Sequence, residues 1–363
     1  MKYFIETLKN DLSIKVSELL GLPIGQVAIE NANPKFGADL AIPVFKFGSA
    51  DKPPDVLASE IASQLKHPSV AKVEAVSGYI NLWLHPVALA DGVFTDQENA
   101  RGERRRYGDS SQFGGQETVI EFTDPNPFKE LHIGHAYSNT VGESLAKLFE
   151  AAGSKVHRVT YGGDVGLHVA KAIWGIKQLE YEESQVFGAV PVEERASFLG
   201  RAYALGATRF EEDDSVKAEV QALNKLIYEQ SDPEINQIRE TGKQWSYDYF
   251  NQMYDRFGMR FEKHYSESDA APKGMEMVRV GQERGVFKES DGAIIFRGED
   301  HGLHTRVFVN KEGLPTYEAK DLGLMFLKDA DYHYDRSIIL TGSEQSEYFK
   351  VMLKAAELLQ PEL

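Results

Sequence analysis

Apolar residues near the amino terminus recur every three or four positions, the spacing of a buried helix face. The pattern extends over residues 4–20 and comprises Phe4, Ile5, Leu8, Leu12, Val16 and Leu19. A second helix is predicted from Pro53 and Pro54 to Lys66, because proline suits the first turn of a helix. Short apolar runs predict strands at residues 27–29, 70–76 and 79–84. Together these elements predict a small α+β domain over residues 1–90.

The pattern is interrupted between residues 91 and 116, where polar residues and glycine dominate. This segment contains the arginines Arg101, Arg104, Arg105 and Arg106. Apolar residues are too sparse here to form a buried face, so a solvated linker is predicted.

From residue 117 onward, apolar runs alternate with helical patterns. The runs at 118–122 and 156–160 predict buried strands, and helices are predicted after them at 134–152 and 165–179. Such alternation is typical of a parallel sheet, in which ligands bind at the carboxyl ends of the strands. The predicted fold class is therefore α/β, with a sheet domain over residues 117–363.

The rest of this domain is predicted to contain a helical insertion. Residues 180–235 are charged and helix-prone without a strand pattern, and a long helix is predicted at 233–257. Further strands are predicted at residues 260–264, 286–288, 293–296, 306–309 and 337–341. Two more helices are predicted, one at 317–328 and one from Gln345 almost to Leu363.

Composition narrows the possible functions. The net charge is −16, and it is uneven: residues 1–116 hold 12 Lys and Arg against 14 Asp and Glu, whereas the remainder holds 28 against 42. Loose binding to nucleic acid is therefore disfavoured, and a polyanion-binding face is expected in the first third. Cysteine is absent, which excludes disulfides and thiolate metal sites. The sequence has no apolar run of about 18 residues, so we expect no membrane span and a cytoplasmic location.

The most informative stretch is "EFTDPNPFKELHIGH", Glu121 to His135. A strand ends, two prolines shape a tight loop, and a helix begins near Gly134. The start of such a helix presents free backbone N–H groups that favour anions. His132 and His135 can donate to phosphate oxygens, and Gly134 lets a flat base approach the backbone. At the first strand-to-helix turn of a parallel sheet, this pattern predicts an ATP site.

This stretch resembles the arginyl-tRNA synthetases, a branch of the class I aminoacyl-tRNA synthetases that carry the "HIGH" signature. Four further strings occur in the order of that family: "YGGDVGLH" from Tyr161, "YSESD" from Tyr265, "DGAIIF" from Asp291 and "GLPTYEAKDLG" from Gly313. In the first third, "NPKFGADLAIPVF" and "GYINLWL" resemble the family's amino-terminal accessory domain. The resemblance covers essentially the whole chain and implies a HIGH-type, Rossmann-like catalytic domain.

The resemblance implies a pocket for arginine. A guanidinium is planar and permanently charged, and carboxylates hold it best in bidentate geometry. The implied arginine-binding residues are Glu121, Asn126, Asp164, Tyr317 and Asp321. Tyr317 and Asp321 are one helical turn apart and so share a face. The alternative for Glu121 is a paired acid at a strand end, and the alternative for Asp164 is a capping residue in a glycine-rich turn.

The implied reaction has two steps. The arginine carboxylate attacks the α-phosphate of ATP and releases pyrophosphate, and the arginyl group then passes to the terminal adenosine of tRNA(Arg). Catalysis comes from alignment and charge stabilisation, for which Lys129, His132 and His135 are the candidates. The resemblance assigns ATP binding to His132, Gly134, His135 and Gln345, with Mg²⁺ accompanying ATP. It assigns tRNA contacts to Lys35, Phe36, Tyr79 and Asn81, and we expect a monomer.

Two positions depart from the family pattern: Tyr348 replaces a usual histidine and Val165 a usual tryptophan. A "KMSKS"-type loop and an anticodon-binding domain are not visible, so we expect a truncated chain. A fragment or paralogue that binds ATP, arginine or RNA without efficient catalysis is one alternative. Another is a HIGH-type nucleotidyltransferase that acts on a small acid without tRNA. His301 and His304 lack a third ligand and predict an exposed loop rather than a metal site.

Overall fold

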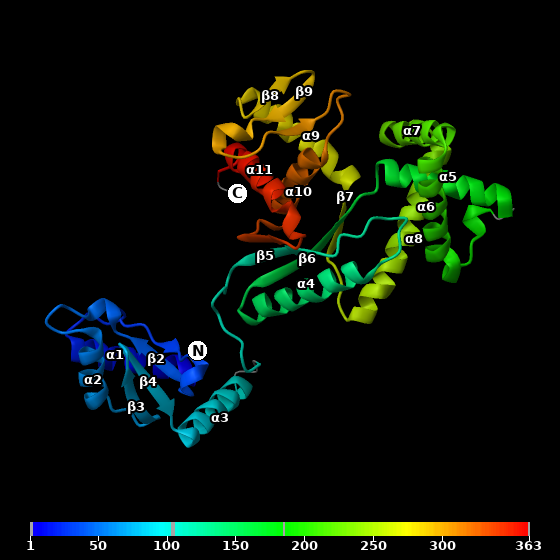
Figure 1. Cartoon of the computed structure of the whole chain (residues 1–363). Coiled ribbons are helices and arrows are strands. Elements are labelled where there is room, and N and C mark those ends of the chain that lie inside the picture. The colour runs from blue at the N-terminus through cyan, green and yellow to red at the C-terminus, as the bar shows by residue number, and fades with distance from the viewer. Residues whose placement is uncertain (1–2, 103–105, 184–185, 362–363) are drawn as a thin grey trace. The chain divides into compact units, whose positions relative to one another are not determined.

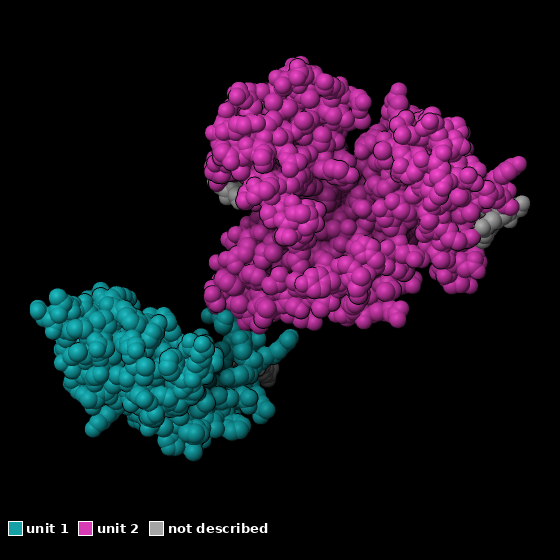
Figure 2. All heavy atoms as spheres, in the orientation of Figure 1, with its two compact units in different colours: residues 1–111 teal, residues 112–363 magenta. Residues whose placement is uncertain are grey.

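The structure is a computed structural model that describes residues 3–102, 106–183 and 186–361 (Figure 1). The chain divides into two compact units, residues 1–111 and 112–363 (Figure 2). The division falls within the segment 91–116. Two arginines of that segment, Arg104 and Arg105, lie outside the described residues.

In the first unit, an antiparallel sheet carries two helices. The described strands have the order β1-β2-β4-β3, with the bounds Glu30–Asn31, Leu40–Pro43, Tyr79–Leu84 and Val70–Val76. The helices α1 (Phe4–Leu20) and α2 (Pro54–Gln64) share a hydrophobic core with the strands. Leu8 and Leu12 are buried in that core, as their helical spacing predicts, and Leu57 of α2 is buried with them.

Two predictions for this unit are wrong. No strand forms at residues 27–29; β1 begins at Glu30 and pairs with the short β2, whose proline makes it hard to predict. The predicted linker contains most of helix α3 (Pro86–Gly102), in which Asp96 is buried. The backbone N–H of Phe4 donates to the Asp96 carboxylate at 2.7 Å, so α3 is fastened to the start of α1 by a polar contact that apolar spacing does not reveal.

The second unit is built on a parallel sheet of strand order β11-β5-β6-β7. The bounds of these strands are Arg336–Ile339, Glu117–Glu121, Lys155–Gly162 and Lys263–Ser266. Helix α4 (Ile133–Ala151) connects β5 to β6. The chain then adds β7 on one side, and β11 returns to the other side of β5. This change of direction opens a crevice beside the carboxyl ends of β5 and β11.

The insertion forms a helical body. Helices α6 (Arg195–Glu212) and α7 (Asp214–Glu229) pack with α5 (Leu167–Glu183) and α8 (Pro233–Phe257) around one hydrophobic core. Figure 1 shows these helices gathered at one end of the unit. The core includes Val169, Ile238 and Trp245, together with Phe128, which comes from the loop after β5.

The last three helices and a small antiparallel sheet form a second layer, and α9 (Glu267–Glu283) and α10 (Tyr317–Tyr332) pack against the parallel sheet. Together with α11 (Ser346–Leu359), these helices share a core with the antiparallel sheet. That sheet has the order β10-β9-β8, with the bounds Arg306–Val309, Ala293–Phe296 and Phe287–Ser290. These three strands therefore do not join the parallel sheet. Helix α9 was not predicted because Pro272 lies within it. None of the helices in the described part of the chain combines the length and apolar character of a membrane crossing.

Candidate active site

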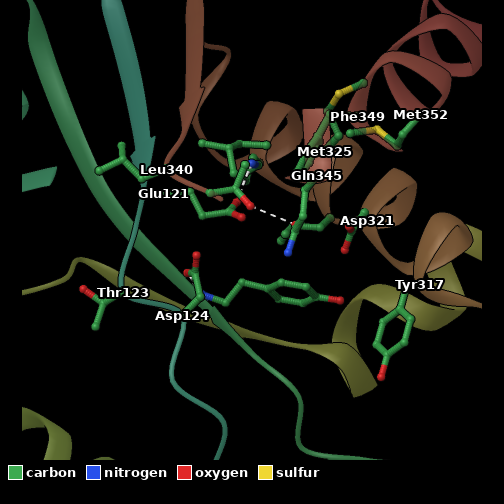
Figure 3. Close-up of a pocket in the computed structure, with 15 residues that line it drawn as sticks. Glu121, Thr123, Asp124, Tyr317, Asp321, Met325, Leu340, Gln345, Phe349 and Met352 are labelled. Carbon is green, nitrogen blue, oxygen red and sulfur yellow. Dashed lines mark hydrogen bonds and ion pairs between the residues drawn. The ribbon is translucent and has the colours of Figure 1, made fainter. Parts of the chain in front are cut away.

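A cavity of about 330 Å³ lies in the crevice at the carboxyl ends of β5 and β11 (Figure 3). We call it the acidic pocket, because three carboxylates and one lysine line it. Its lining residues are Glu121, Thr123, Asp124, Tyr161, Tyr317, Asp321, Leu324, Met325, Lys328, Ile339, Leu340, Thr341, Gln345, Phe349 and Met352. Three of the five predicted arginine-binding residues, Glu121, Tyr317 and Asp321, are in this set.

Glu121 is paired inside the acidic pocket. Its Oε2 atom lies 2.6 Å from Nζ of Lys328, and both side chains are buried, with 6% and 1% exposed. The alternative of a paired strand-end acid is therefore present in the structure. Lys328 was not predicted as a site residue, because it follows an apolar run on α10 and resembles an ordinary surface lysine. The pair accounts for one carboxylate oxygen of Glu121.

Burial shifts the pKa of the other two carboxylates upward. Burial raises the pKa of Asp124 well above its ordinary value, and nearby Glu121 adds to the shift. Burial also raises the pKa of Asp321 to about 7, although Tyr348 donates its hydroxyl to Asp321 and opposes the shift. Tyr348, the departure from the family pattern, thus stands directly behind a predicted arginine ligand.

The acidic pocket suits one monovalent cation. The ion pair of Glu121 and Lys328 is balanced within itself, whereas burial raises the pKa of Asp124 and brings that of Asp321 to about 7. The hydroxyl of Tyr161 is buried and has no hydrogen-bond partner among the described residues. Buried polar groups in proteins are nearly always hydrogen-bonded, so an unpartnered hydroxyl in a cavity indicates a place for a polar ligand atom.

The two histidines of the signature cap helix α4. Nδ1 of His132 accepts a hydrogen bond from the backbone N–H of Gly134 at 3.0 Å, and Nδ1 of His135 accepts one from the backbone N–H of His132 at 3.1 Å. Burial, and then the neighbouring His132, lower the pKa of His135 to about 4. Both rings therefore use Nδ1 as an acceptor, which leaves Nε2–H as the donor toward a ligand.

A second hollow of about 620 Å³ lies between α4 and β11. We call it the apolar hollow. It is lined by Gly134, Tyr137, Ser138, Val141, Leu145, Ile338, Ile339, Leu340, Thr341 and Gly342. Gly134 was predicted as an ATP contact. The acidic pocket and the apolar hollow share Ile339, Leu340 and Thr341, so the end of β11 separates them.

Four residues predicted at ATP do not line the apolar hollow. His132 and His135 line another hollow, between α4 and α8, and Gln345 and Lys129 lie elsewhere. Gln345, predicted beside ATP, lines the acidic pocket, where its Oε1 accepts a hydrogen bond from Thr341 at 2.8 Å. Lys129, predicted to reach the phosphates, places its ammonium 4.5 Å from the ring centre of Tyr203 on α6. A cation over an aromatic face is attracted to it, which draws the lysine toward the helical body.

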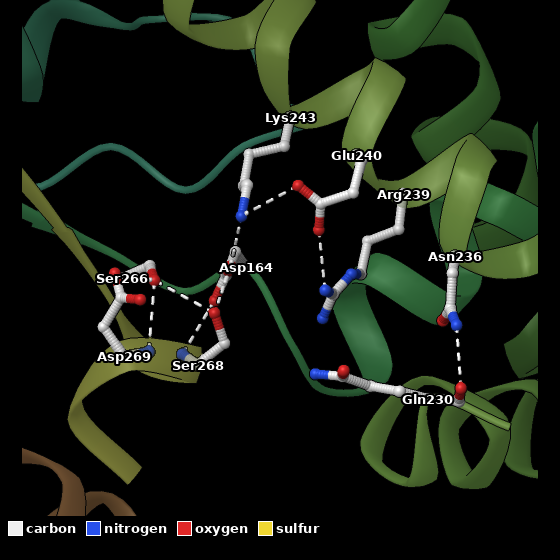
Figure 4. Close-up of polar contacts among 9 residues, drawn as sticks. All are labelled: Asp164, Gln230, Asn236, Arg239, Glu240, Lys243, Ser266, Ser268 and Asp269. Carbon is white, nitrogen blue, oxygen red and sulfur yellow. Dashed lines mark hydrogen bonds and ion pairs between the residues drawn. The ribbon is translucent and has the colours of Figure 1, made fainter. Parts of the chain in front are cut away.

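Asp164 does not line the acidic pocket, and its role in arginine binding stays a prediction; its own contacts are shown in Figure 4. Its buried carboxylate accepts hydrogen bonds from the backbone and hydroxyl of Ser268, at 2.9 and 2.6 Å, and pairs with Lys243 at 3.1 Å. Asn126 is likewise engaged, because its Oδ1 accepts from the backbone N–H of Gly163 at 2.8 Å. Both residues fasten the loops around the strand ends.

In the first unit, three of the predicted RNA contacts come together. Phe36, Tyr79 and Asn81 line a hollow of about 430 Å³, which we call the unit 1 hollow. Its other lining residues are Glu30, Asn31, Ala32, Asn33, Pro34 and Ala41. Half of Phe36 and 40% of Tyr79 are exposed, so both rings are accessible. Lys35 does not line this hollow.

His301 and His304 lie at the turn and loop between β9 and β10. Among the residues that the structure describes, no group of three or more histidine, aspartate or glutamate side chains could hold a metal ion.

Family models identify the chain. A model described as "tRNA synthetases class I (R), catalytic domain" matches residues 100–360. A model described as "Arginyl tRNA synthetase N terminal domain" matches residues 6–84. The chain belongs to the arginyl branch of the class I tRNA synthetases. The predicted family is thereby confirmed, and so is the fold class of a HIGH-type catalytic domain preceded by an accessory domain.

Similar synthetases extend over more sequence than this chain. An arginine–tRNA ligase from Clostridioides difficile is 29% identical over 363 residues, which are 99% of this chain and 62% of that protein. One from Treponema denticola is 29% identical over 339 residues, 90% of this chain and 56% of that protein. The chain therefore spans about three-fifths of the length of these curated relatives.

Solved synthetases share the fold. The arginyl-tRNA synthetase of Thermus thermophilus matches with a TM-score of 0.67 at 21% identity, over 97% of this chain and 62% of that one. The enzyme of Plasmodium falciparum matches with a TM-score of 0.71 at 15% identity, over 99% of this chain and 62% of that one. At these identities the likeness concerns the fold alone.

Proposed function

We propose that this chain activates L-arginine with ATP and transfers it to tRNA(Arg), as an arginine–tRNA ligase. The observation that carries the proposal is the acidic pocket, which lies at the same strand edge as the histidine-capped start of α4. A site for a cationic side chain thus adjoins a site for an anionic, base-containing ligand.

Arginine would bind in the acidic pocket with its guanidinium toward Glu121 and Asp321. Each of these carboxylates has one oxygen engaged, Glu121 with Lys328 and Asp321 with Tyr348, and one oxygen left for the ligand. Tyr317 and the free hydroxyl of Tyr161 line the same cavity. A guanidinium carries five N–H donors, so it can satisfy all of these acceptors at once.

ATP would bind along α4 and the end of β11. The apolar hollow offers aliphatic and aromatic side chains to a base, and Gly134 leaves room for it beside the backbone. The Nε2–H groups of His132 and His135 would donate to phosphate oxygens. Mg²⁺ accompanying ATP would neutralise part of the triphosphate charge.

The chemistry needs no covalent intermediate with the protein. A carboxylate oxygen of arginine forms a bond to the α-phosphorus of ATP as the bond to pyrophosphate breaks. The 2′-hydroxyl of the terminal tRNA adenosine then displaces AMP from the arginyl carbonyl. The Nε2–H groups of the two imidazoles and the free N–H groups at the start of the helix would stabilise the phosphate charge. Lys129 would contribute a further cation if it left Tyr203 for the phosphates, which makes it a candidate catalytic residue.

The first unit would contact tRNA through the unit 1 hollow. Phe36 and Tyr79 can stack on an unpaired base, Asn81 can read its edge, and Lys35 can approach the backbone. This arrangement agrees with the nearly neutral charge of residues 1–116 beside the acidic remainder. We further propose that the chain acts as a monomer in the cytoplasm, without a membrane partner.

A fragment or paralogue that binds ATP, arginine or RNA without efficient aminoacylation remains the second candidate. One observation favours it: Tyr348 occupies a position where the family usually has histidine.

Calorimetry with matched ligands tests the proposal. L-Arginine should bind, whereas citrulline, its uncharged isostere, should bind at least about tenfold more weakly because a buried charge-assisted contact is lost. Equal affinity for both ligands would refute a guanidinium site. Arginine-dependent exchange of pyrophosphate into ATP then separates the candidates, since the fragment hypothesis predicts binding without exchange.

A further inference from the structure

The loop between β5 and α4 is bent into an unusual backbone conformation. Of the seven non-glycine residues with a positive φ in the described chain, three lie in this loop: Thr123 at 75°, Asp124 at 47° and Phe128 at 67°. Such conformations are sparsely populated by residues with a Cβ, and they persist only where the surroundings impose them. Contacts outside the loop must therefore hold it.

One of these contacts is made by the ring of Phe128. The side chain is fully buried and belongs to the hydrophobic core of the helical body, which α5, α6, α7 and α8 build. A residue of the signature loop is thus inserted into the core of the insertion. The neighbouring Lys129 also lies against this body, over Tyr203.

Helix α8 provides a fitted seat for Phe128. A Cβ atom added to Gly242 would lie 2.2 Å from Cε1 of Phe128, so the ring occupies the space that a side chain would need. The backbone N–H of Phe128 donates to Oγ of Ser246 at 2.9 Å, and that hydroxyl donates to the carbonyl of Gly242 at 2.8 Å. Ring and backbone of the same residue are therefore fixed by one turn of α8.

The other end of the loop is fastened to the sheet. The carboxylate of Asp124 accepts from the backbone N–H of Tyr161 at 2.8 Å, and Asn126 accepts from Gly163 at 2.8 Å. Phe128 lies between these contacts and His132, the residue that caps α4. At this point the loop is held by the packing of the Phe128 ring against α8. A shift of that ring would move the start of the backbone segment that leads through Lys129 to His132.

We propose that Phe128, seated on Gly242 and Ser246, is a positioning residue that sets where Lys129 and His132 meet ATP. The proposal rests on the proposed function for the identity of the ligand. It assigns no role to the seat in arginine binding, because no residue of α8 lines the acidic pocket.

The variant Gly242→Ala tests this with a single methyl group. We expect the Kd of the 363-residue chain for ATP to rise at least about fivefold, while the Kd for arginine changes by less than about twofold. The matched control is Gly188→Ala, the same change in the insertion at a position where an added Cβ meets nothing within 4 Å. Its affinities for both ligands should equal those of the parent chain.

Rescue separates positioning from a general loss of structure. Phe128→Leu reduces the group that the methyl would strike, so Gly242→Ala combined with Phe128→Leu should bind ATP as Phe128→Leu alone does. Unchanged ATP affinity in Gly242→Ala, equal loss for ATP and arginine, or failure of the rescue would each overturn the proposal.

A readout without ligand keeps the test independent of the proposed function. In hydrogen–deuterium exchange, Gly242→Ala should speed the exchange of amides in residues 126–132, while those of β5 and β6 keep their rates. If the parent chain bound no ATP, the proposed function would fail, and the exchange of this loop would still decide the role of Phe128. Unchanged exchange in the loop would overturn it.

Discussion

The acidic pocket and the apolar hollow lie on the two sides of one strand end, yet their chemistry is opposite. On one side of β11, Glu121, Asp124 and Asp321 gather around a single lysine. On the other side, mostly aliphatic and aromatic side chains of α4 and β11 face a larger space. Because both share Ile339, Leu340 and Thr341, the contrast arises from their other walls: β5, the loop after it and α10 supply the charged groups of the acidic pocket, whereas α4 supplies most of the rest of the apolar hollow.

This difference shows how two unlike ligands can be brought into contact without competing. A guanidinium is attracted by carboxylates and gains little from aliphatic walls, whereas a base gains from apolar contact and the phosphates beside it are repelled by carboxylates. Under the proposed function, each ligand would therefore favour its own site, and their reacting ends would meet near the shared residues.

The largest effect should follow from removing the cation of the acidic pocket. Lys328→Met leaves Glu121 buried without its partner, and breaking a buried ion pair costs about 3 kcal/mol or more of unfolding free energy. Urea denaturation at pH 7 measures this loss. The control Lys263→Met breaks the partly exposed pair with Asp331, where the side chains are 44% and 35% exposed, and should cost less than about 1 kcal/mol. Equal effects would mean that burial of the Lys328 pair has no special weight.

Neutralising Glu121 tests the acidic pocket as a binding site for arginine. Glu121→Gln should weaken arginine binding by about 1.5–3 kcal/mol, because a charge-assisted contact is replaced by a neutral one. ATP binding should stay within about twofold, since the residue does not line the apolar hollow. Glu117→Gln, at the opposite end of the same strand, serves as the control. Calorimetry that finds equal losses for arginine and ATP would remove the distinction between the two sites.

A substitution at Gly134 should have the opposite selectivity, weakening ATP binding but not arginine binding. A Cβ added there would lie 2.8 Å from Cε1 of His132, so the ring must shift and its cap of α4 is weakened. Loss of a helix cap costs about 1 kcal/mol, and we expect Gly134→Ala to reduce ATP affinity by about fivefold. Arginine affinity should be retained, as should both affinities in Gly200→Ala, where an added Cβ makes an ordinary contact at 3.4 Å.

The smallest effect concerns the titration of Asp321. With its pKa raised to about 7 by burial, Asp321 is increasingly ionised as the pH rises from 6 to 8, so arginine affinity should rise over this range and level off above it. Tyr348→Phe removes a hydrogen bond to the carboxylate, which raises its pKa further and should lower arginine affinity about twofold to threefold at pH 7. Calorimetry across this range gives the profile. Asp321→Asn should flatten it, and a profile unchanged in that variant would exclude Asp321 as its source.

The order of elements at the site could be predicted from sequence, because it depends on local patterns. The strand, the proline-containing loop and the helix after Gly134 follow from residues that are neighbours in the chain. Tyr317 and Asp321 share a face because they lie one turn apart, and both line the acidic pocket. The apolar periodicity of residues 4–20 likewise determines which side of α1 is buried.

What could not be predicted depends on partners distant in sequence. No residue near Lys328 in the sequence indicates that it forms an ion pair with Glu121. Likewise, the turn after β6 does not indicate that Asp164 pairs with Lys243 and accepts a hydrogen bond from Ser268. Lys129 is a flexible side chain whose direction is set by Tyr203 on another helix. The left-handed backbone at Phe128 opposes local preference, so only the tertiary contacts that impose it could reveal it.

The pairing of Glu121 with Lys328 also has a consequence for how the chain assembles. The two residues are 207 positions apart, so during synthesis β5 emerges long before the lysine that will neutralise its last residue. Closing so long a loop is entropically unfavourable, and contacts of such separation form late. The strands β5 and β6 are separated by α4 alone and can associate first, with one edge of β5 still open. We therefore expect α10 and β11 to dock after β5 and β6 have paired, so that Glu121 meets Lys328 late in folding.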